Sequence, residues 1–431
     1  MRTWRNASRL GTTAGVYGVT NAVNAAVPIM LLPVLTRYLQ PSDYGIVALY
    51  EILLGVGIPL VGLSVAGAIS RQYYHCDAID FPSYIGTTIL LVVAAALVAG
   101  LVVAIAGPGV GRFLGFPPAW LWIVLAATVG QVLVQVTLVM WQVRMKAARF
   151  GAFRIAQTVV NLGLSIVLVV GAEMGWQGRV LGQAGSSIIF GALGLGLLIR
   201  SGQVMVRYRP QYAQQALRFG LPLIPHALGF MSMTMIDRLF VTRMLGPADL
   251  GRYFVGYQIG MGMSLIQNSF NQAWTPWLFG ELKANRPGAR RLIVRLTYGY
   301  FGLLVVLAVL LGLAAPYLMS FLVADTYAGS SQFVAWIAGG YAFVGMYKMV
   351  TNYIFYVGRT HLLAMITLLS VGLGVIANYT LISRYGLVGA AQASLLTFGA
   401  SFVGTWAVAA RAYPMPWALR EPARTSGRSD P

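Results

Sequence analysis

The sequence predicts an all-α polytopic membrane protein, with about twelve transmembrane helices in two six-helix lobes related by a parallel repeat. Three observations lead to this prediction. The 431 residues are 58% hydrophobic and only 10% charged, whereas a soluble domain is about 25% charged. Long apolar runs recur along the whole chain, and one ten-residue phrase occurs once in each half.

The apolar runs are long enough to cross a bilayer as helices. Residues 85–107 and 302–319 are almost entirely apolar, and about 20 such residues span the hydrocarbon core. The runs are continuous rather than alternating, so they are not barrel strands. We expect spans at roughly 12–36, 44–70, 84–107, 119–143, 150–172, 178–199, 217–244, 251–278, 292–318, 331–357, 362–383 and 387–411.

Lysine and arginine are distributed unequally over the expected loops. Of the 30 such residues, 22 fall at the N-terminus, in the even-numbered loops or in the tail, and 6 fall in the other loops. The remaining two, Arg238 and Lys348, fall inside spans. The positive-inside rule then places both termini of this multi-pass protein in the cytoplasm. We expect no nucleic-acid partner, because a soluble basic face with stacking aromatics is missing.

The repeated phrase reads TRYLQPSDYG from residue 36 and TRMLGPADLG from residue 242. Six spans separate the copies, so both halves have the same orientation, as in parallel-repeat transporters. A weaker echo pairs Gly175 and Gly178 with Gly386 and Gly389. We therefore expect an N-terminal lobe over 1–200, a cytoplasmic linker over 201–216, a C-terminal lobe over 217–411 and a cytoplasmic tail over 412–431.

Each copy of the phrase lies between the first and second spans of its half. Pro41 and Pro247 suit the first turn of a helix, where a missing N–H costs nothing. Asp43 and Asp249 follow in that turn, where the helix dipole favours a carboxylate. We interpret the phrase as a mark of architecture rather than a site of chemistry.

Four charged residues stand out because they lie well inside the expected spans, namely Glu51, Asp237, Arg238 and Lys348. A charge at the bilayer centre costs about 2.5–3.5 kcal/mol on insertion scales, so each needs a reason. One reason is substrate binding in a cavity between the lobes. The alternative is a structural ion pair, for instance between Glu51 and Arg238.

Uncharged polar residues form stripes along several spans. The first span carries Asn21 and Asn24 on one face, and the eighth carries Tyr257, Asn268 and Gln272. Interhelical hydrogen bonds explain single residues of this kind, but a wet cavity for hydroxyl-rich cargo better explains whole stripes. We expect no metal or cofactor, because the chain has one cysteine and three widely separated histidines.

Two stretches are informative, VPIMLLPVLTRYLQPSDYGIVALY in the first half and MIDRLFVTRMLGPADLGRYFVGYQIG in the second. Both resemble the bacterial polysaccharide transporters, the O-antigen flippase group of the multidrug/oligosaccharidyl-lipid/polysaccharide exporter superfamily, which implies a location in the bacterial inner membrane. The resemblance implies alternating-access transfer of undecaprenyl-diphosphate-linked oligosaccharide to the periplasmic leaflet, for O-antigen, capsule or exopolysaccharide. It implies substrate binding by Arg238 and Lys348, with a glycan polymerase and glycosyltransferases as pathway partners.

At the cytoplasmic rim, Arg154, Arg218 and Arg359 are positioned to recruit an anionic substrate. Binding of anionic membrane lipids is the competing explanation for these three residues. A cation-coupled multidrug exporter of the same superfamily is the runner-up function, although the first span lacks the acidic residue that such exporters commonly carry. A glycan polymerase or glycosyltransferase is the second alternative. The short periplasmic loops argue against an enzyme of that kind.

Overall fold

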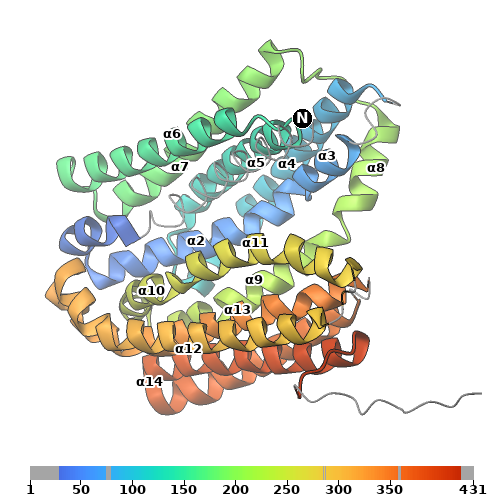
Figure 1. Ribbon diagram of the computed structural model, residues 1–431. Helices are drawn as coiled ribbons and strands as arrows, with labels where there is room; N and C mark the ends of the chain where they lie inside the picture. Colours follow the sequence, from blue (N-terminus) through green and yellow to red (C-terminus); the bar gives the residue numbers. More distant parts are fainter. Residues whose placement is uncertain (1–28, 74–78, 285, 287, 358–360, 419–431) are drawn as a thin grey trace, which may run out of the picture.

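The computed structural model describes residues 29–73, 79–284, 286, 288–357 and 361–418, and helices make up nearly all of them (Figure 1). Over these residues the chain forms no β-strand. The all-α prediction is therefore confirmed. The helices pack lengthwise against one another, as expected of a polytopic membrane protein.

The first half contains the helix Ile29–Tyr38 and six further α-helices, and short 3₁₀ and π segments flank two of the six. They are α2 (Pro41–Gly62), α3 (Val65–Tyr73), α4 (Phe81–Leu114), η2 (Pro118–Trp120), α5 (Leu121–Val143), α6 (Ala147–Ile166), η3 (Val167–Gly171) and α7 (Gly175–Arg200). The second half contains α8 (Pro210–Gly220), α9 (Leu223–Met244), α10 (Pro247–Met261), α11 (Met263–Ala284), α12 (Ala289–Leu322), η4 (Asp325–Ser330), α13 (Ser331–Tyr356) and α14 (His361–Ala412).

Eight helices of the described chain are long and apolar enough to cross a membrane, or nine if one bent pair counts as a single span. The predicted number of twelve is not confirmed. The last two predicted spans form one continuous element, α14, with a kink at Gly386. The predicted span 12–36 lies mostly outside the described residues, which include only the short helix Ile29–Tyr38.

Two other predicted spans are interrupted. The predicted span 44–70 breaks at Leu63 and Ser64, both with positive φ, so that α2 and α3 are separate helices. Pro59 lies in the last turn of α2, where it cannot donate a backbone hydrogen bond. The predicted span 251–278 breaks at Gly262, between α10 and α11. A hydropathy pattern alone does not reveal such breaks, because the sequence on both sides of them is apolar.

Corresponding helices of the two halves share their irregularities. Both α4 and α12 are 34 residues long, and Pro108 and Pro316 occupy the same position within them. Gly175 and Gly386 both have φ +57°, and a Cβ on Gly178 or Gly389 would collide with the backbone of the preceding helix. The structural similarity of the two halves therefore extends beyond the ten-residue phrase from which the repeat was predicted.

The two copies of the repeated phrase contact each other. A Cβ added to Gly45 would lie 1.9 Å from the carbonyl oxygen of Pro247, and one added to Gly251 would lie 1.8 Å from that of Pro41. The helices α2 and α10 therefore cross backbone to backbone, which only glycine permits. We call this end of the molecule, formed by residues 36–45 and 242–251, the crossing end.

Each copy of the phrase also forms a hydrogen bond with the end of a long helix from the opposite half. Arg243 Nη1 donates to the carbonyl oxygen of Phe113 at 2.5 Å, and the guanidinium lies over the Phe113 ring, at the end of α4. Thr36 Oγ1 accepts from the backbone N–H of Ala324 at 3.2 Å, just after α12. The crossing end thus joins the halves through backbone and side-chain contacts.

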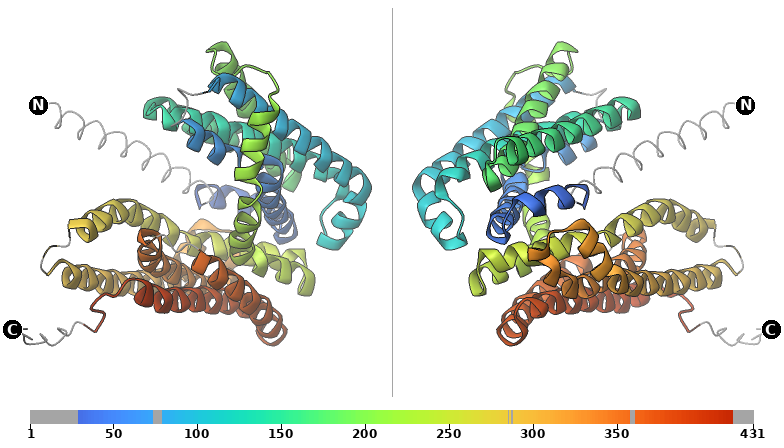
Figure 2. Two further views of the ribbon diagram at one scale, coloured as in Figure 1. Left: turned by 90° about the vertical axis from the view of Figure 1, so that its right-hand side faces the viewer. Right: turned by 90° about the vertical axis from the view of Figure 1, so that its left-hand side faces the viewer.

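Figure 2 shows the first half (blue to green) and the second half (yellow to red) as two groups, with α8 running from one to the other. A large buried core cluster includes residues of α2, α10 and α13, so it joins the groups. A second cluster lies where α3, α4 and α5 of the first half pack with α8. The predicted domain boundaries remain a prediction.

The predicted linker is attached to the start of α4. Met205 N–H donates to the carbonyl oxygen of Pro82 at 3.1 Å, and Thr87 Oγ1 donates to that of Arg207 at 2.9 Å. The carboxylate of Asp80 faces Arg209 at 3.4 Å. Hydrogen bonds from Ser83, followed by the charge of Arg209, lower the pKa of Asp80. Residues 205–209 thus lie along the first half.

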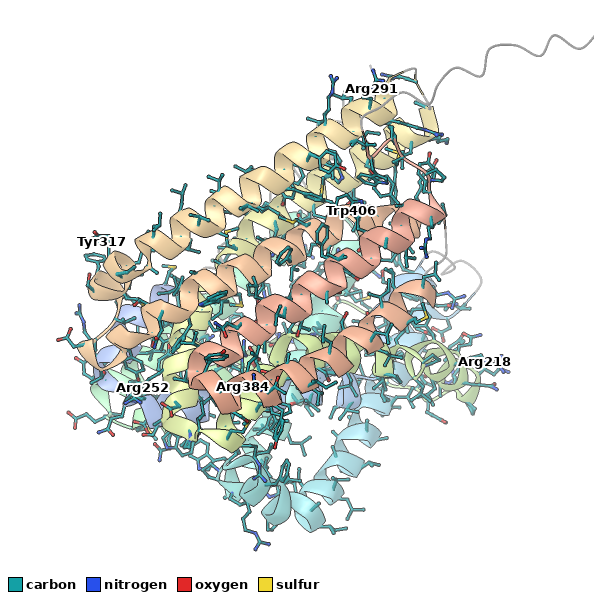
Figure 3. All side chains as sticks on the ribbon, turned by 90° about the horizontal axis from the view of Figure 1, so that it is seen from below. Arg218, Arg252, Arg291, Tyr317, Arg384 and Trp406 are labelled. Atoms are coloured by element: carbon teal, nitrogen blue, oxygen red, sulfur yellow. The ribbon has the colours of Figure 1, made fainter. Side chains whose placement is uncertain are left out.

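The orientation in the membrane can be tested directly. Arg218 and Arg291 lie toward one end of the molecule and Arg252 and Arg384 toward the other (Figure 3), as the unequal loop charges require. Reporter fusions after residues 145, 205, 285 and 415 should read cytoplasmic, and fusions at 41, 175, 248 and 325 periplasmic. Alkaline phosphatase and green fluorescent protein activities measure the two locations. Opposite locations for the two termini would contradict the parallel repeat.

Candidate functional site

A polar cavity of about 240 Å³ lies inside the first half, between α2, α5, α6 and α7. We call it the first-half cavity. Its lining contains two arginines, one glutamate, and several amides and hydroxyls. The residues are Glu51, Leu54, Ile58, Gln131, Arg154, Gln157, Thr158, Asn161, Arg179, Gln183, Ser186 and Ser187. Because α2 packs on α9 and α10, the cavity lies beside the second half.

Arg179 is the main residue that sequence reasoning missed. Its position at the start of a predicted span suggested a loop residue on the outer face. Instead the side chain is only 5% exposed, and Nη1 donates to Asn161 Oδ1 and to Ser165 Oγ, both at 2.9 Å. The signal that could have revealed it is the polar stripe of α6, because Asn161 and Ser165 lie one turn apart on one face.

Arg154, which we expected at the cytoplasmic rim, lines the same cavity. Its Nη1 donates to Gln157 Oε1 at 3.0 Å, and Gln157 Nε2 donates to Gln131 Oε1 at 3.3 Å. Ser187 Oγ donates to the same Gln131 oxygen at 3.4 Å. Within the described chain, Gln183 Oε1 is buried without a hydrogen-bond partner. The lining is therefore a connected polar network with acceptor and donor capacity left over.

Glu51 lies in the lining of the first-half cavity and interacts electrostatically with Arg179 and Arg238. The two arginines belong to opposite halves of the chain. Among the described residues, no ion pair within 4.0 Å joins Glu51 to either guanidinium. The suggested direct pair between Glu51 and Arg238 is therefore replaced by a longer-range interaction across the boundary between the halves.

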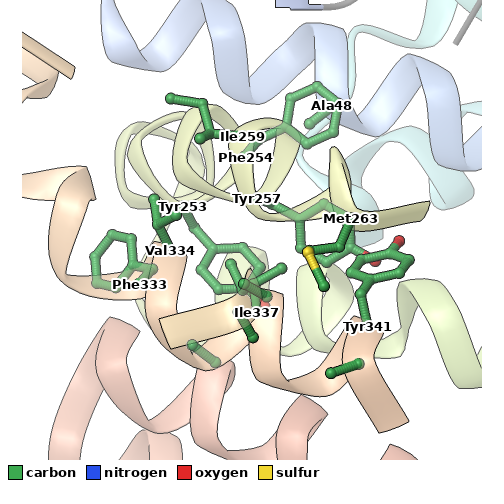
Figure 4. Packing of buried hydrophobic residues seen from close by; sticks show 14 of the residues in the cluster. Ala48, Tyr253, Phe254, Tyr257, Ile259, Met263, Phe333, Val334, Ile337 and Tyr341 are labelled. Carbon is green, nitrogen blue, oxygen red and sulfur yellow. The ribbon is translucent and has the colours of Figure 1, made fainter. Parts of the chain in front are cut away.

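Arg238 is buried between two aromatic rings. Its guanidinium lies 4.7 Å from the ring centroid of Phe254 and 4.3 Å from that of Tyr257, a favourable arrangement for a desolvated cation. Its side chain is 4% exposed. The Tyr257 hydroxyl lies 2.8 Å from that of Tyr341, in the packed region between α10 and α13 (Figure 4).

Asp237 is satisfied by neutral donors. Tyr253 Oη donates to Asp237 Oδ2 at 2.5 Å and Ser394 Oγ donates to the same oxygen at 3.0 Å. The backbone N–H of Arg238 donates to Oδ1 at 2.8 Å. A buried carboxylate that accepts three such hydrogen bonds is stable without a cation in direct contact. Asp237 and Arg238 thus point into different surroundings although they are adjacent.

Lys348 of α13 and Asn268 of α11 form a more accessible polar pair. Lys348 Nζ donates to Asn268 Oδ1, and Asn268 and Gln272 are exposed on α11. One turn further along α11, Asn271 Oδ1 accepts from Asn352 Nδ2 at 3.3 Å. Three of the predicted site residues, Lys348, Asn268 and Gln272, therefore lie on adjacent helices.

The remaining predicted residues divide into two groups. Asn21, Asn24 and Arg359 lie outside the described residues. Arg218 is exposed on α8 and lines a second cavity, of about 670 Å³, together with Arg71 and Phe219. In the described part of the chain, no group of three or more His, Cys, Asp or Glu side chains could hold a metal ion.

Comparison with protein families gives two matches. The family described as "Polysaccharide biosynthesis protein" matches residues 10–280, and the family described as "MatE" matches residues 222–380. A relative from Haemophilus influenzae, "Lsg locus putative protein 1", is 23% identical over 365 residues, which cover 82% of this chain and 87% of the relative. An "Uncharacterized membrane protein" from the same organism is 25% identical and covers 83% of this chain and 86% of its own length.

Solved structures resemble the chain over nearly its whole length. The inward closed conformation of the lipid II flippase MurJ has a TM-score of 0.68 at 11% identity, and it covers 91% of this chain and 86% of its own. The inward-facing conformation of a multidrug resistance MATE family transporter of the MOP superfamily has a TM-score of 0.65 at 15% identity, with 95% and 96% covered. At such low identity these likenesses establish a shared fold.

Proposed function

The chain belongs to the polysaccharide biosynthesis protein family, and from this premise we propose that it is a flippase for lipid-linked oligosaccharide. It moves a polyprenyl-diphosphate-linked repeat unit of O-antigen, capsule or exopolysaccharide from the cytoplasmic to the periplasmic leaflet. Both termini are cytoplasmic, and the halves alternate access around a binding region between them. Glycosyltransferases supply this substrate and a polymerase consumes it.

One observation carries the proposal, namely the placement of cationic and amide side chains inside apolar helices. Lys348 with Asn268 lies in the second half, and Arg154 and Arg179 lie in the first. An anionic lipid-linked glycan is costly to transfer into hydrocarbon, and positive charge in a low-dielectric region offsets that cost. Amide groups in turn match sugar hydroxyls, since each can donate and accept.

The binding region proposed here uses residues of both halves. Lys348 and Arg238 attract the diphosphate, with Asp237 and Glu51 setting the charge around Arg238. Asn268, Gln272 and Tyr257 hydrogen-bond to the glycan, joined by Asn21 and Asn24. Because Arg238 and Tyr257 are nearly fully buried here, their contact with substrate belongs to another state of the transport cycle. Arg218 and Arg359 recruit the anionic lipid at the cytoplasmic face.

A multidrug exporter is the second candidate, because the MatE family matches residues 222–380. That match covers the second half only, and residues 12–36 contain no aspartate or glutamate. The lipid-linked substrate is therefore the better-supported proposal.

The test is export of lipid-linked glycan per unit of folded protein in the native host. A strain without the protein should accumulate lipid-linked glycan that a non-permeant lectin cannot reach in spheroplasts. Lys348→Ala should lower lectin-accessible glycan about tenfold or more, since a lost charge-assisted contact changes affinity by that order. Lys348→Arg should retain part of the export.

Lys283→Ala provides the matched control, because Lys283 is exposed at the end of α11. It should leave export unchanged. Full export by Lys348→Ala would remove this residue from the substrate path. Normal glycan delivery in the strain without the protein would contradict the flippase function itself.

A further inference from the structure

We propose that the first-half cavity binds one acidic monosaccharide unit of the glycan, with the sugar carboxylate on Arg154 and Arg179 and its hydroxyls on the surrounding amides. This inference rests on the proposed function and identifies the chemical class of part of its substrate. It adds a specificity-determining site separate from Lys348 and Asn268 of the second half.

The charge of the lining matches a single carboxylate. Two arginines and one glutamate give the cavity one net positive charge. A monoanion neutralises that charge, whereas a diphosphate adds excess negative charge beside Glu51. A metal cation or a cationic drug would be repelled by the two guanidinium groups. The cavity therefore selects against both the carrier's diphosphate and cationic cargo.

The donors left by the protein suit an oxyanion. In the described chain, every hydrogen bond of Arg154 and Arg179 comes from Nη1, so the Nε–H and Nη2 groups of both are available to a ligand. Those groups form the planar fork that grips a carboxylate with two parallel hydrogen bonds. Asn161 and Gln157 hold the guanidinium groups in place beforehand.

The rest of the lining suits one sugar ring. Gln131 and Gln183 present amide groups for hydroxyls, and Gln183 Oε1 is buried without a partner among the described residues, a cost that a sugar hydroxyl would remove. Leu54 and Ile58 offer an apolar wall for the C–H face of the ring. About 240 Å³ holds roughly eight waters, which corresponds to one monosaccharide rather than a repeat unit.

Saturation-transfer NMR on the purified full chain in detergent tests the site with defined probes. Methyl β-D-glucuronide supplies one carboxylate, and methyl β-D-glucoside is its neutral match. Inorganic pyrophosphate represents the carrier's anion and, because it has no carbon-bound protons, is added as a competitor whose binding is read from loss of the glucuronide signal. The glucuronide should bind, and the other two should bind at least about tenfold more weakly. Arg154→Gln should weaken glucuronide binding about tenfold or more, as expected for loss of a charged hydrogen-bond donor.

The control is Arg149→Gln, which removes an exposed arginine that precedes Arg154 on α6 and should leave binding unchanged. Arg179→Lys provides a second, charge-conserving variant and should weaken binding because lysine lacks the planar fork. Equal glucuronide binding by wild type and Arg154→Gln would overturn the site. Preferential binding of pyrophosphate would assign it to the carrier instead.

Absence of glucuronide binding by folded wild-type protein would also refute the acidic-sugar site. The flippase function is judged separately by lectin-accessible glycan in cells. A protein that exports glycan but binds no glucuronide therefore refutes only this inference.

Discussion

Replacing Gly45 or Gly251 with alanine should destabilise the folded protein by about 1–3 kcal/mol each, the usual cost of overpacking. Each added methyl would lie within 2 Å of a proline carbonyl oxygen in the opposite half, whereas real Cβ contacts stay beyond 3.0 Å. Backbone atoms cannot rotate away, so α2 and α10 must separate by about 1 Å or more. Heat denaturation in detergent measures the loss.

The double variant gives the sharper result. Once one methyl has separated the two helices, the second methyl clashes less with the opposite backbone. The loss of unfolding free energy in the double variant should therefore be smaller than the sum of the losses in the single variants. Gly163→Ala and Gly196→Ala are matched controls, because both glycines lie in helices with no atom within 4 Å of the added Cβ. They should leave stability unchanged or raise it by up to about 1 kcal/mol. Equal losses at all four glycines would refute the close crossing.

Arg238→Ala should lower export per folded molecule about tenfold or more, with Arg238→Lys partly active. The guanidinium of Arg238 is buried between Phe254 and Tyr257, and no carboxylate among the described residues lies within 4.0 Å of that guanidinium. Asp237 already has three neutral donors, so Arg238 is not required to neutralise it by contact. Lectin-accessible glycan, normalised to folded protein, is the measurement.

A purely structural role predicts a different pattern. Loss of Arg238 would then leave Glu51 or Asp237 without compensation and deplete the protein. Combining Arg238→Ala with Glu51→Gln or Asp237→Asn would restore both abundance and export. Restored export in either double variant would exclude Arg238 as an essential substrate ligand. Phe254→Leu serves as a packing control, because it removes one ring from the guanidinium and keeps the charge.

Hydropathy predicted the helical architecture well, since every described helix of 20 or more residues overlaps a predicted span. It could not predict the breaks at Leu63 and Gly262, because a local change of φ and ψ leaves composition unchanged. The repeat predicted that the halves are parallel. It did not predict that the two copies touch, because similarity within a sequence carries no distance.

The candidate site was only partly foreseeable. Lys348, Asn268 and Gln272 were identified because polar residues in an apolar span need a reason. Arg179 was not, because an arginine within the first turn of a span usually reaches the membrane surface. Only packing against Asn161 and Ser165 turns it inward. Which face of a helix meets which neighbour is decided by tertiary contacts that one sequence does not reveal.

The glycine crossing gives the chain a property normally associated with homodimers. Gly45 meets Pro247 and Gly251 meets Pro41, which is the self-complementary pairing of an isologous interface. In a homodimer one mutation alters both partners at once, but here each copy is encoded separately. Neither copy can therefore change alone without losing its fit to the other. Each copy of the phrase is thus the packing partner of the other.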